Sequence, residues 1–215
     1  MNIAAFAALC ATLLGAIAGC GDGAGYEGGA DAAAERARLR GLLSETRDLP
    51  DGFSARPRDE WSVPFRPVDK DCRIVLDAAA GGPARRAPGV RVAVTYQGDR
   101  LGELAGVGLT SYAGDGAERR FAELGRALGG CAVVKGGVAG RGTTFTVSPL
   151  DLDGIGDGVQ ARRLSGRLNG YPYEMNLVFA LSGHTVVSLV HAGMEGVDVE
   201  RTRELAHFLV GRTAA

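Results

Sequence analysis

Four cysteines carry the most specific chemistry in this sequence. They stand at positions 10, 20, 72 and 131 of a 215-residue chain. Thiols form disulfides, bind metals, act as nucleophiles or carry lipids, and their spacing separates these uses. Cys72 and Cys131 belong to no Cys-x-x-Cys motif and have no histidine close by in the sequence, so a redox or metal-binding pair is the less favoured interpretation of them.

The sequence before Cys20 resembles a bacterial lipoprotein signal. Residues 3–19 are almost wholly apolar and end in Ile-Ala-Gly directly before Cys20. In a lipobox of this kind, signal peptidase II cuts before a cysteine that carries the lipid. No Lys or Arg precedes the apolar run, although signal peptides normally begin with positive charge, and a buried N-terminal helix is the alternative. We expect a signal peptide over 1–19, with Cys10 inside it, and lipidation at Cys20.

Removal of the signal peptide and acylation of Cys20 would leave two cysteines. In an oxidising compartment such an even pair forms a disulfide by default, so we expect a bond between Cys72 and Cys131. It would close a loop of about 60 residues, which the chain-entropy model values at roughly 4 kcal/mol.

The other polar motifs do not form a catalytic or metal-binding pattern. His184, His191 and His207 show no ligand spacing and are expected to be ordinary surface or rim residues. The acidic segment 151–158 partly fits a calcium loop but lacks two of the main ligands, which favours a simple turn. The glycines of 136–142 do not fit a phosphate-binding loop, and no nucleophile-elbow motif is present. We therefore expect no catalytic residue, no metal site and no cofactor.

The composition excludes further classes of protein. A formal net charge of −1 argues against a nucleic-acid partner, because nucleic-acid binders normally carry a strong basic excess. The hydrophobic content of 46% is too high for a disordered chain. One predicted strand carries three arginines, Arg162, Arg163 and Arg167. They would suit an anion-binding surface, and a solvent-exposed face of the sheet is the simpler interpretation.

The segment after Cys20 has a linker-like composition. Residues 21–34 are mostly Gly, Ala and acidic residues, which cannot bury enough apolar area to offset chain entropy. We expect a flexible tether over residues 20–34, with a reach of roughly 20 Å if it behaves as a Gly-rich coil.

Residues 35–215 are expected to form one folded domain. Leucines at helical spacing follow Asp31, and further helices are expected at 73–80, at 117–128 and after Asp198. Alternating patterns predict a short edge strand at 61–65 and longer strands at 90–96, 105–111, 131–135, 143–148, 160–168, 173–181 and 185–191. Hairpin-linked strands with segregated helices indicate an α+β fold with an antiparallel sheet covered on one face.

Several of these pieces, taken in order, resemble a known family. They are a helix ending in Leu-Pro-Asp-Gly-Phe at 49–53, Cys72, a two-strand unit, the helix 117–128 running into Cys131, the Gly156-Asp157 turn, a late hydrophobic hairpin and a last helix. This set resembles the PknH-type extracellular sensor domain, in its lipoprotein form, over roughly residues 39–210. Such domains occur on some actinobacterial kinases and on many lipoproteins.

The resemblance implies a twisted antiparallel sheet with packed helices and a cleft proposed to bind a ligand. Together with the strand patterns, we expect about six strands with the helices packed mainly on one face. It also implies a disulfide at the positions of Cys72 and Cys131. The kinase-linked members carry a second disulfide, for which this chain has no cysteines, and the chain has no kinase domain.

Together these expectations describe a module anchored by lipid to the extracellular face of the cell membrane. It would bind an unknown small molecule or envelope protein without catalysis. Trp61, Tyr112 and Arg163 are the candidate ligand-binding residues, because an aromatic or Arg side chain at a sheet edge can reach a ligand. The alternatives are an envelope hydrolase with a dispersed active site and a structural accessory lipoprotein that docks on another envelope protein.

Overall fold

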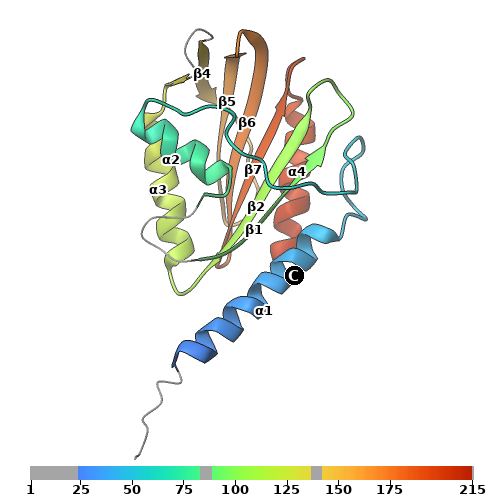
Figure 1. Cartoon of the computed structure of the whole chain (residues 1–215), viewed down its shortest axis with the longest axis vertical. Coiled ribbons are helices and arrows are strands. Elements are labelled where there is room, and N and C mark those ends of the chain that lie inside the picture. The colour runs from blue at the N-terminus through green and yellow to red at the C-terminus, as the bar shows by residue number, and fades with distance from the viewer. Residues whose placement is uncertain (1–23, 83–88, 137–141, 215) are drawn as a thin grey trace, which may run out of the picture.

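The computed structural model describes residues 24–82, 89–136 and 142–214, and these form four helices and one seven-stranded sheet (Figure 1). None of the described helices combines the length and the apolar character needed to span a membrane. Cys20 and the expected signal peptide lie outside the described residues.

Every strand of the sheet pairs antiparallel with its neighbours, in the order β1-β2-β7-β6-β5-β4-β3. The strands are β1 (Gly89–Gln97), β2 (Leu104–Tyr112), β3 (Val133–Gly136), β4 (Thr143–Pro149), β5 (Gly158–Leu168), β6 (Tyr171–Ser182) and β7 (Thr185–Gly193). The helices are α1 (Ala24–Ser44), α2 (Lys70–Ala79), α3 (Gly116–Gly130) and α4 (Val199–Thr213). The expected α+β class and antiparallel sheet are confirmed, with seven strands rather than about six.

The helices cover both faces of the sheet, so the expectation that they pack mainly on one face is wrong. One core cluster joins α2 and α3 to the sheet, and a second cluster on the opposite face joins α1 and α4 to it. The central strands require this arrangement because they are apolar on both sides. In β6, Leu177 and Phe179 enter the first cluster while Val178 and Ala180 enter the second. A sheet of this kind exposes a large apolar surface unless both faces are covered.

Helix α1 begins earlier than expected. It starts at Ala24, so residues 24–34 of the segment expected to be a tether are helical. Alanine has the highest helix propensity of all residues, and this segment contains several alanines. Leu39 and Leu43 are fully buried against the sheet, whereas the first turns of α1 project away from it (Figure 1).

Residues 53–67, called here the crossing segment, run from one edge of the sheet to the other (Figure 1). Isolated antiparallel bridges join Arg58 to β1 and Phe53 to Gly98, directly after β1, at one edge, and Pro67 to β3 at the other. The edge strand expected at 61–65 is therefore wrong: Trp61 instead packs over β2, where a Cβ built on Gly106 would lie 2.6 Å from the Trp61 Cβ. The missing side chain of this glycine lets the segment pass close to the sheet.

A disulfide joins Cys72 to Cys131 across a Cα–Cα distance of 4.9 Å, as the sequence predicts. It connects α2 to the residue that caps the C-terminus of α3. Both sulfurs lie in the first core cluster, so the bond holds together the two helices that cover this face.

Replacing both cysteines with serine should destabilise the domain by roughly 4 kcal/mol, because the unfolded chain loses a closed loop of 59 residues. The measurement is urea denaturation of the oxidised chain and of the double variant Cys72→Ser/Cys131→Ser. Reduced wild-type chain is the control and should unfold near the midpoint of the double variant. Equal midpoints for the oxidised chain and the double variant would contradict the role assigned to this bond.

Candidate functional site

The three predicted ligand-binding residues lie in different places. Trp61 is half-buried on the crossing segment, on the face covered by α2 and α3. Tyr112 is buried at the end of β2 and lines a pocket. Arg163 lies on β5, where its Nε donates to Asn176 Oδ1 at 3.3 Å and its guanidinium pairs with Glu174 at 3.4 Å. The structure therefore does not bring these three side chains together in one site.

A polar pocket lies at the end of the sheet nearest α1. We call it the basal pocket; it has a volume of about 580 Å³, within the range of small-molecule sites. It lies among α1, the end of β2, the loop before β5, the β6–β7 turn and the end of α4. Its lining includes Glu35, Arg38, Ser111, Tyr112, Asp157 and His184.

Charged groups of both signs line the basal pocket. Arg38 donates two hydrogen bonds of 2.8 Å to Glu35, and these bonds lower the pKa of the Glu35 carboxyl. Asp157 accepts a hydrogen bond of 2.7 Å from the backbone N–H of Gly183. Burial raises the pKa of the Tyr112 hydroxyl, so this group stays protonated at neutral pH. The pocket lining thus includes two carboxylates, a guanidinium and a phenolic hydroxyl, so it contains both acceptor and donor groups.

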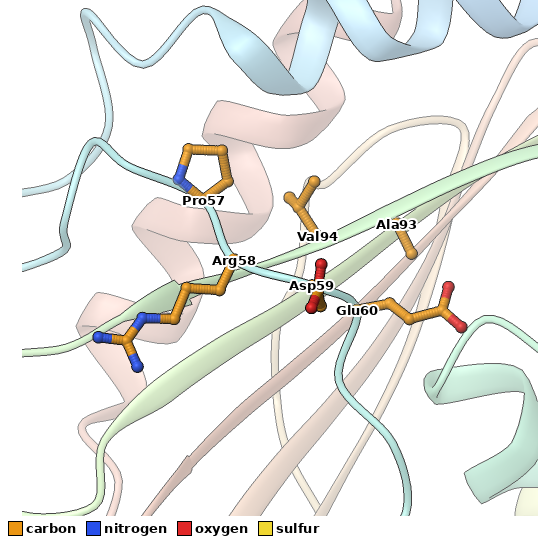
Figure 2. Close-up of a pocket in the computed structure, with 6 residues that line it drawn as sticks. All are labelled: Pro57, Arg58, Asp59, Glu60, Ala93 and Val94. Atoms are coloured by element: carbon orange, nitrogen blue, oxygen red, sulfur yellow. The ribbon is translucent and has the colours of Figure 1, made fainter.

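A second hollow lies where the crossing segment leaves β1, and we call it the edge notch. It is an open depression of about 570 Å³, and Figure 2 shows its lining residues. Its sides are formed by two backbone stretches, the crossing segment at Pro57, Arg58, Asp59 and Glu60, and β1 at Ala93 and Val94. Arg91, further along β1, pairs with Glu60 at 2.6 Å.

A buried polar network joins β7, α4 and the β1–β2 turn. His191 is fully buried, which corrects the expectation of a surface or rim histidine. Its Nε2 lies 3.0 Å from Glu103 Oε1, and its Nδ1 lies 2.9 Å from Thr202 Oγ1. Arg201 pairs with the same Glu103 oxygen at 3.3 Å, and Asn176 donates to Thr202 at 2.8 Å. The sequence signal for this burial was the place of His191 within an otherwise apolar strand.

Thr202, His191 and Glu103 have the connectivity of a hydroxyl–imidazole–carboxylate triad. A catalytic hydroxyl must be accessible to its substrate. Thr202 and His191 are 0% exposed, and the Thr202 hydroxyl also lies 2.9 Å from the Asp198 carbonyl oxygen. This hydroxyl is closed to solvent, and the network fastens the start of α4 to the sheet.

The acidic segment 151–158 forms a turn that packs through its apolar residues. Leu152 and Ile155 are buried in the core cluster of α1 and α4, and Gly154 and Gly156 both have a positive φ. Among the residues that the structure describes, no group of three or more His, Cys, Asp or Glu side chains lies close enough together to hold a metal ion.

Comparison with known proteins finds similarity in structure only. No protein-family model matches the sequence, and a search of curated proteins finds no match. Among solved structures, the extracellular domain of PknH from Mycobacterium tuberculosis superposes with a TM-score of 0.63. The match covers 83% of this chain and 95% of the PknH domain, at 14% sequence identity. This chain has a PknH-like fold. The identity is too low to carry the PknH residues over one by one, so the likeness concerns the fold alone.

Acidification should destabilise the folded chain through His191. Burial lowers the pKa of this imidazole below its ordinary value near 6.5, despite the opposing effect of Glu103. Below pH 6.5 the unfolded chain therefore binds a proton that the folded chain does not. The free energy of unfolding should fall as the pH drops from about 6.5 towards the lowered pKa, by up to about 1.4 kcal/mol per pH unit.

Urea denaturation between pH 7.5 and pH 5.5 measures this dependence. The variant His191→Gln should lose most of the slope, whereas His207→Gln, at an exposed position of α4, should keep it. An equal slope in all three proteins would show that His191 does not cause it.

Proposed function

We propose that this chain is a lipid-anchored, extracytoplasmic, sensor-like module that binds a small polar molecule in the basal pocket and catalyses no reaction. The observation that carries the proposal is the position of this pocket on α1. Glu35 and Arg38 contribute to its lining, and α1 is the helix that follows the expected lipidation site at Cys20.

This arrangement would place the pocket close to the membrane. An α-helix rises 1.5 Å per residue, so the part of α1 between Ala24 and Glu35 spans roughly 17 Å. A ligand bound between α1 and the β6–β7 turn would contact both the connection to the anchor and the body of the domain. Binding would therefore fix the angle between the domain and the membrane, and this angle would be the output of the sensor.

The lining of the pocket indicates the class of ligand. Arg38 and Asp157 offer opposite charges, and Tyr112 and His184 offer a hydroxyl and an imidazole. A small molecule with donors and acceptors on both ends, such as a zwitterion or a sugar, matches this lining better than an apolar ligand.

Two observations support binding rather than catalysis. The His184 Nδ1 in the pocket lies 3.1 Å from the backbone oxygen of Gly114, so this imidazole is engaged with the main chain rather than with a hydroxyl nucleophile. The triad-like group at His191 is buried elsewhere in the domain. The likeness to an extracellular domain adds support by analogy of fold.

Native mass spectrometry of the full chain, extracted in detergent from the membranes of its own host, tests the proposal. We expect a mass increase that corresponds to diacylglyceryl modification of Cys20, and a retained polar small molecule. In the variant Arg38→Ala the retained fraction should fall about tenfold, because the pocket loses a charged hydrogen-bond donor.

Matched variants separate the two claims. Arg40→Ala removes the same charge from an exposed position of α1 that does not line the pocket, and should retain the molecule. Cys20→Ala should lose the lipid mass. If Cys20→Ala stays bound to the membrane and is processed normally, with the signal peptide removed, the anchor is overturned. Equal retention by Arg38→Ala and Arg40→Ala, or no retained molecule at all, would overturn the ligand site.

A further inference from the structure

Strand β1 forms one edge of the sheet, so half of its backbone groups point away from β2. The contacts of the crossing segment show which half. Thr95 exchanges two backbone hydrogen bonds with Arg58, of 2.8 and 3.2 Å, and the Gln97 oxygen accepts from Ser54 at 2.8 Å. Because backbone direction alternates along a strand, Ala93 and Arg91 must also point outward, as must Gly89 at the start of β1.

The outward groups of these three residues have no backbone partner within the described part of the chain. The edge notch opens directly beside Ala93 (Figure 2). In the described residues, the buried side-chain polar atoms that lack a hydrogen-bond partner also lie on this strand, at Arg91 Nε and Thr95 Oγ1. The backbone groups of Gly89, Arg91 and Ala93 on the β1 edge are therefore available to a further strand within the described part of the chain.

The chain itself shows that this edge accepts an extended segment. The crossing segment pairs with β1 at Ser54 and Arg58 and then turns away across the face of the sheet. Because the crossing segment turns away after Arg58, its pairing with β1 ends at Thr95. The next outward residue of β1, Ala93, is left without a strand partner on its outward side among the residues that the structure describes. A second extended segment placed end to end with the crossing segment would continue the same ladder along Ala93, Arg91 and Gly89.

We propose that the β1 edge binds an extended peptide segment of another protein, with alternating apolar and polar residues, by strand addition at Gly89, Arg91 and Ala93. Such recognition uses main-chain hydrogen bonds for affinity and alternate side chains for specificity. The half-buried side chains of Val90 and Val92 lie on the α1 face of the edge, and Arg91 and Glu60 lie on the other. The segment would therefore alternate apolar residues on the α1 face with polar residues on the face of the crossing segment.

A second copy of this chain is a poorer occupant. Antiparallel self-pairing that uses all three outward residues places Arg91 directly opposite Arg91 of the other copy. Like charges directly opposite one another destabilise a strand pair. This site is also separate from the basal pocket, and the inference does not rest on the ligand proposed there.

The test selects binders from a phage-displayed library of random peptides of about nine residues, using the full chain in detergent as bait. Enriched peptides are synthesised and their affinity is measured by fluorescence anisotropy. We expect peptides with alternating apolar residues. Their binding to Ala93→Pro should be about tenfold weaker, because proline lacks the outward N–H donor.

Proline at position 93 should leave the pairing of β1 with β2 intact, because the N–H it removes points outward from an edge strand. The matched control is Ala93→Val, which keeps this N–H and should bind the peptides nearly as well as the wild-type chain. Methylation of alternate peptide nitrogens tests the same bonds on the unaltered protein, and one of the two alternating sets should abolish binding. Failure to enrich any peptide, equal binding to Ala93→Pro, or indifference to methylation at every position would overturn the proposal. A dimer of the wild-type chain in sedimentation that Ala93→Pro disrupts would overturn it in favour of self-pairing.

Discussion

The structure depends on the burial of both faces of the two central strands. All nine residues of β7 are buried, and β6 beside it sends apolar side chains to both core clusters. Neither face of these strands can be left to water without a large loss of hydrophobic free energy. Two pairs of helices are therefore required, and the disulfide and the crossing segment reinforce the face that α2 and α3 cover.

This constraint leaves the ends and the edges of the sheet for recognition. The basal pocket occupies one end, beside α1, and the edge notch occupies the outer side of β1. Polar groups inside the domain serve a different purpose. His191, Glu103 and Thr202 satisfy one another's hydrogen bonds and hold α4 against β7, which is why a buried imidazole is tolerated in an apolar strand. The interior is thus structural, and the proposed functions lie at its boundaries.

Sequence patterns between near neighbours predicted the elements that depend on neighbouring residues. Alternation located the long strands, and the two cysteines left after removal of the signal peptide predicted the disulfide. Alternation alone does not predict the covering of both faces, because it places Leu177 and Phe179 on one apolar face and does not show that Val178 and Ala180 between them enter a second core. The alternation around Trp61 predicts a strand, whereas the packing of Trp61 depends on Gly106, a residue distant in sequence. The residues of the basal pocket could not be predicted for the same reason. The fold places α1 beside the β6–β7 turn, and the spacing of residues along the chain does not indicate that these two segments meet.

Residue-resolved amide hydrogen exchange tests most directly the account of a doubly covered sheet with an open β1 edge. The account predicts the slowest exchange in β6 and β7, and an alternation along β1. The amides of Val92 and Val94, which point towards β2, should be protected, whereas those of Arg91 and Ala93 should exchange rapidly. Uniform protection along β1, or exchange of β7 as fast as that of the turns, would contradict it.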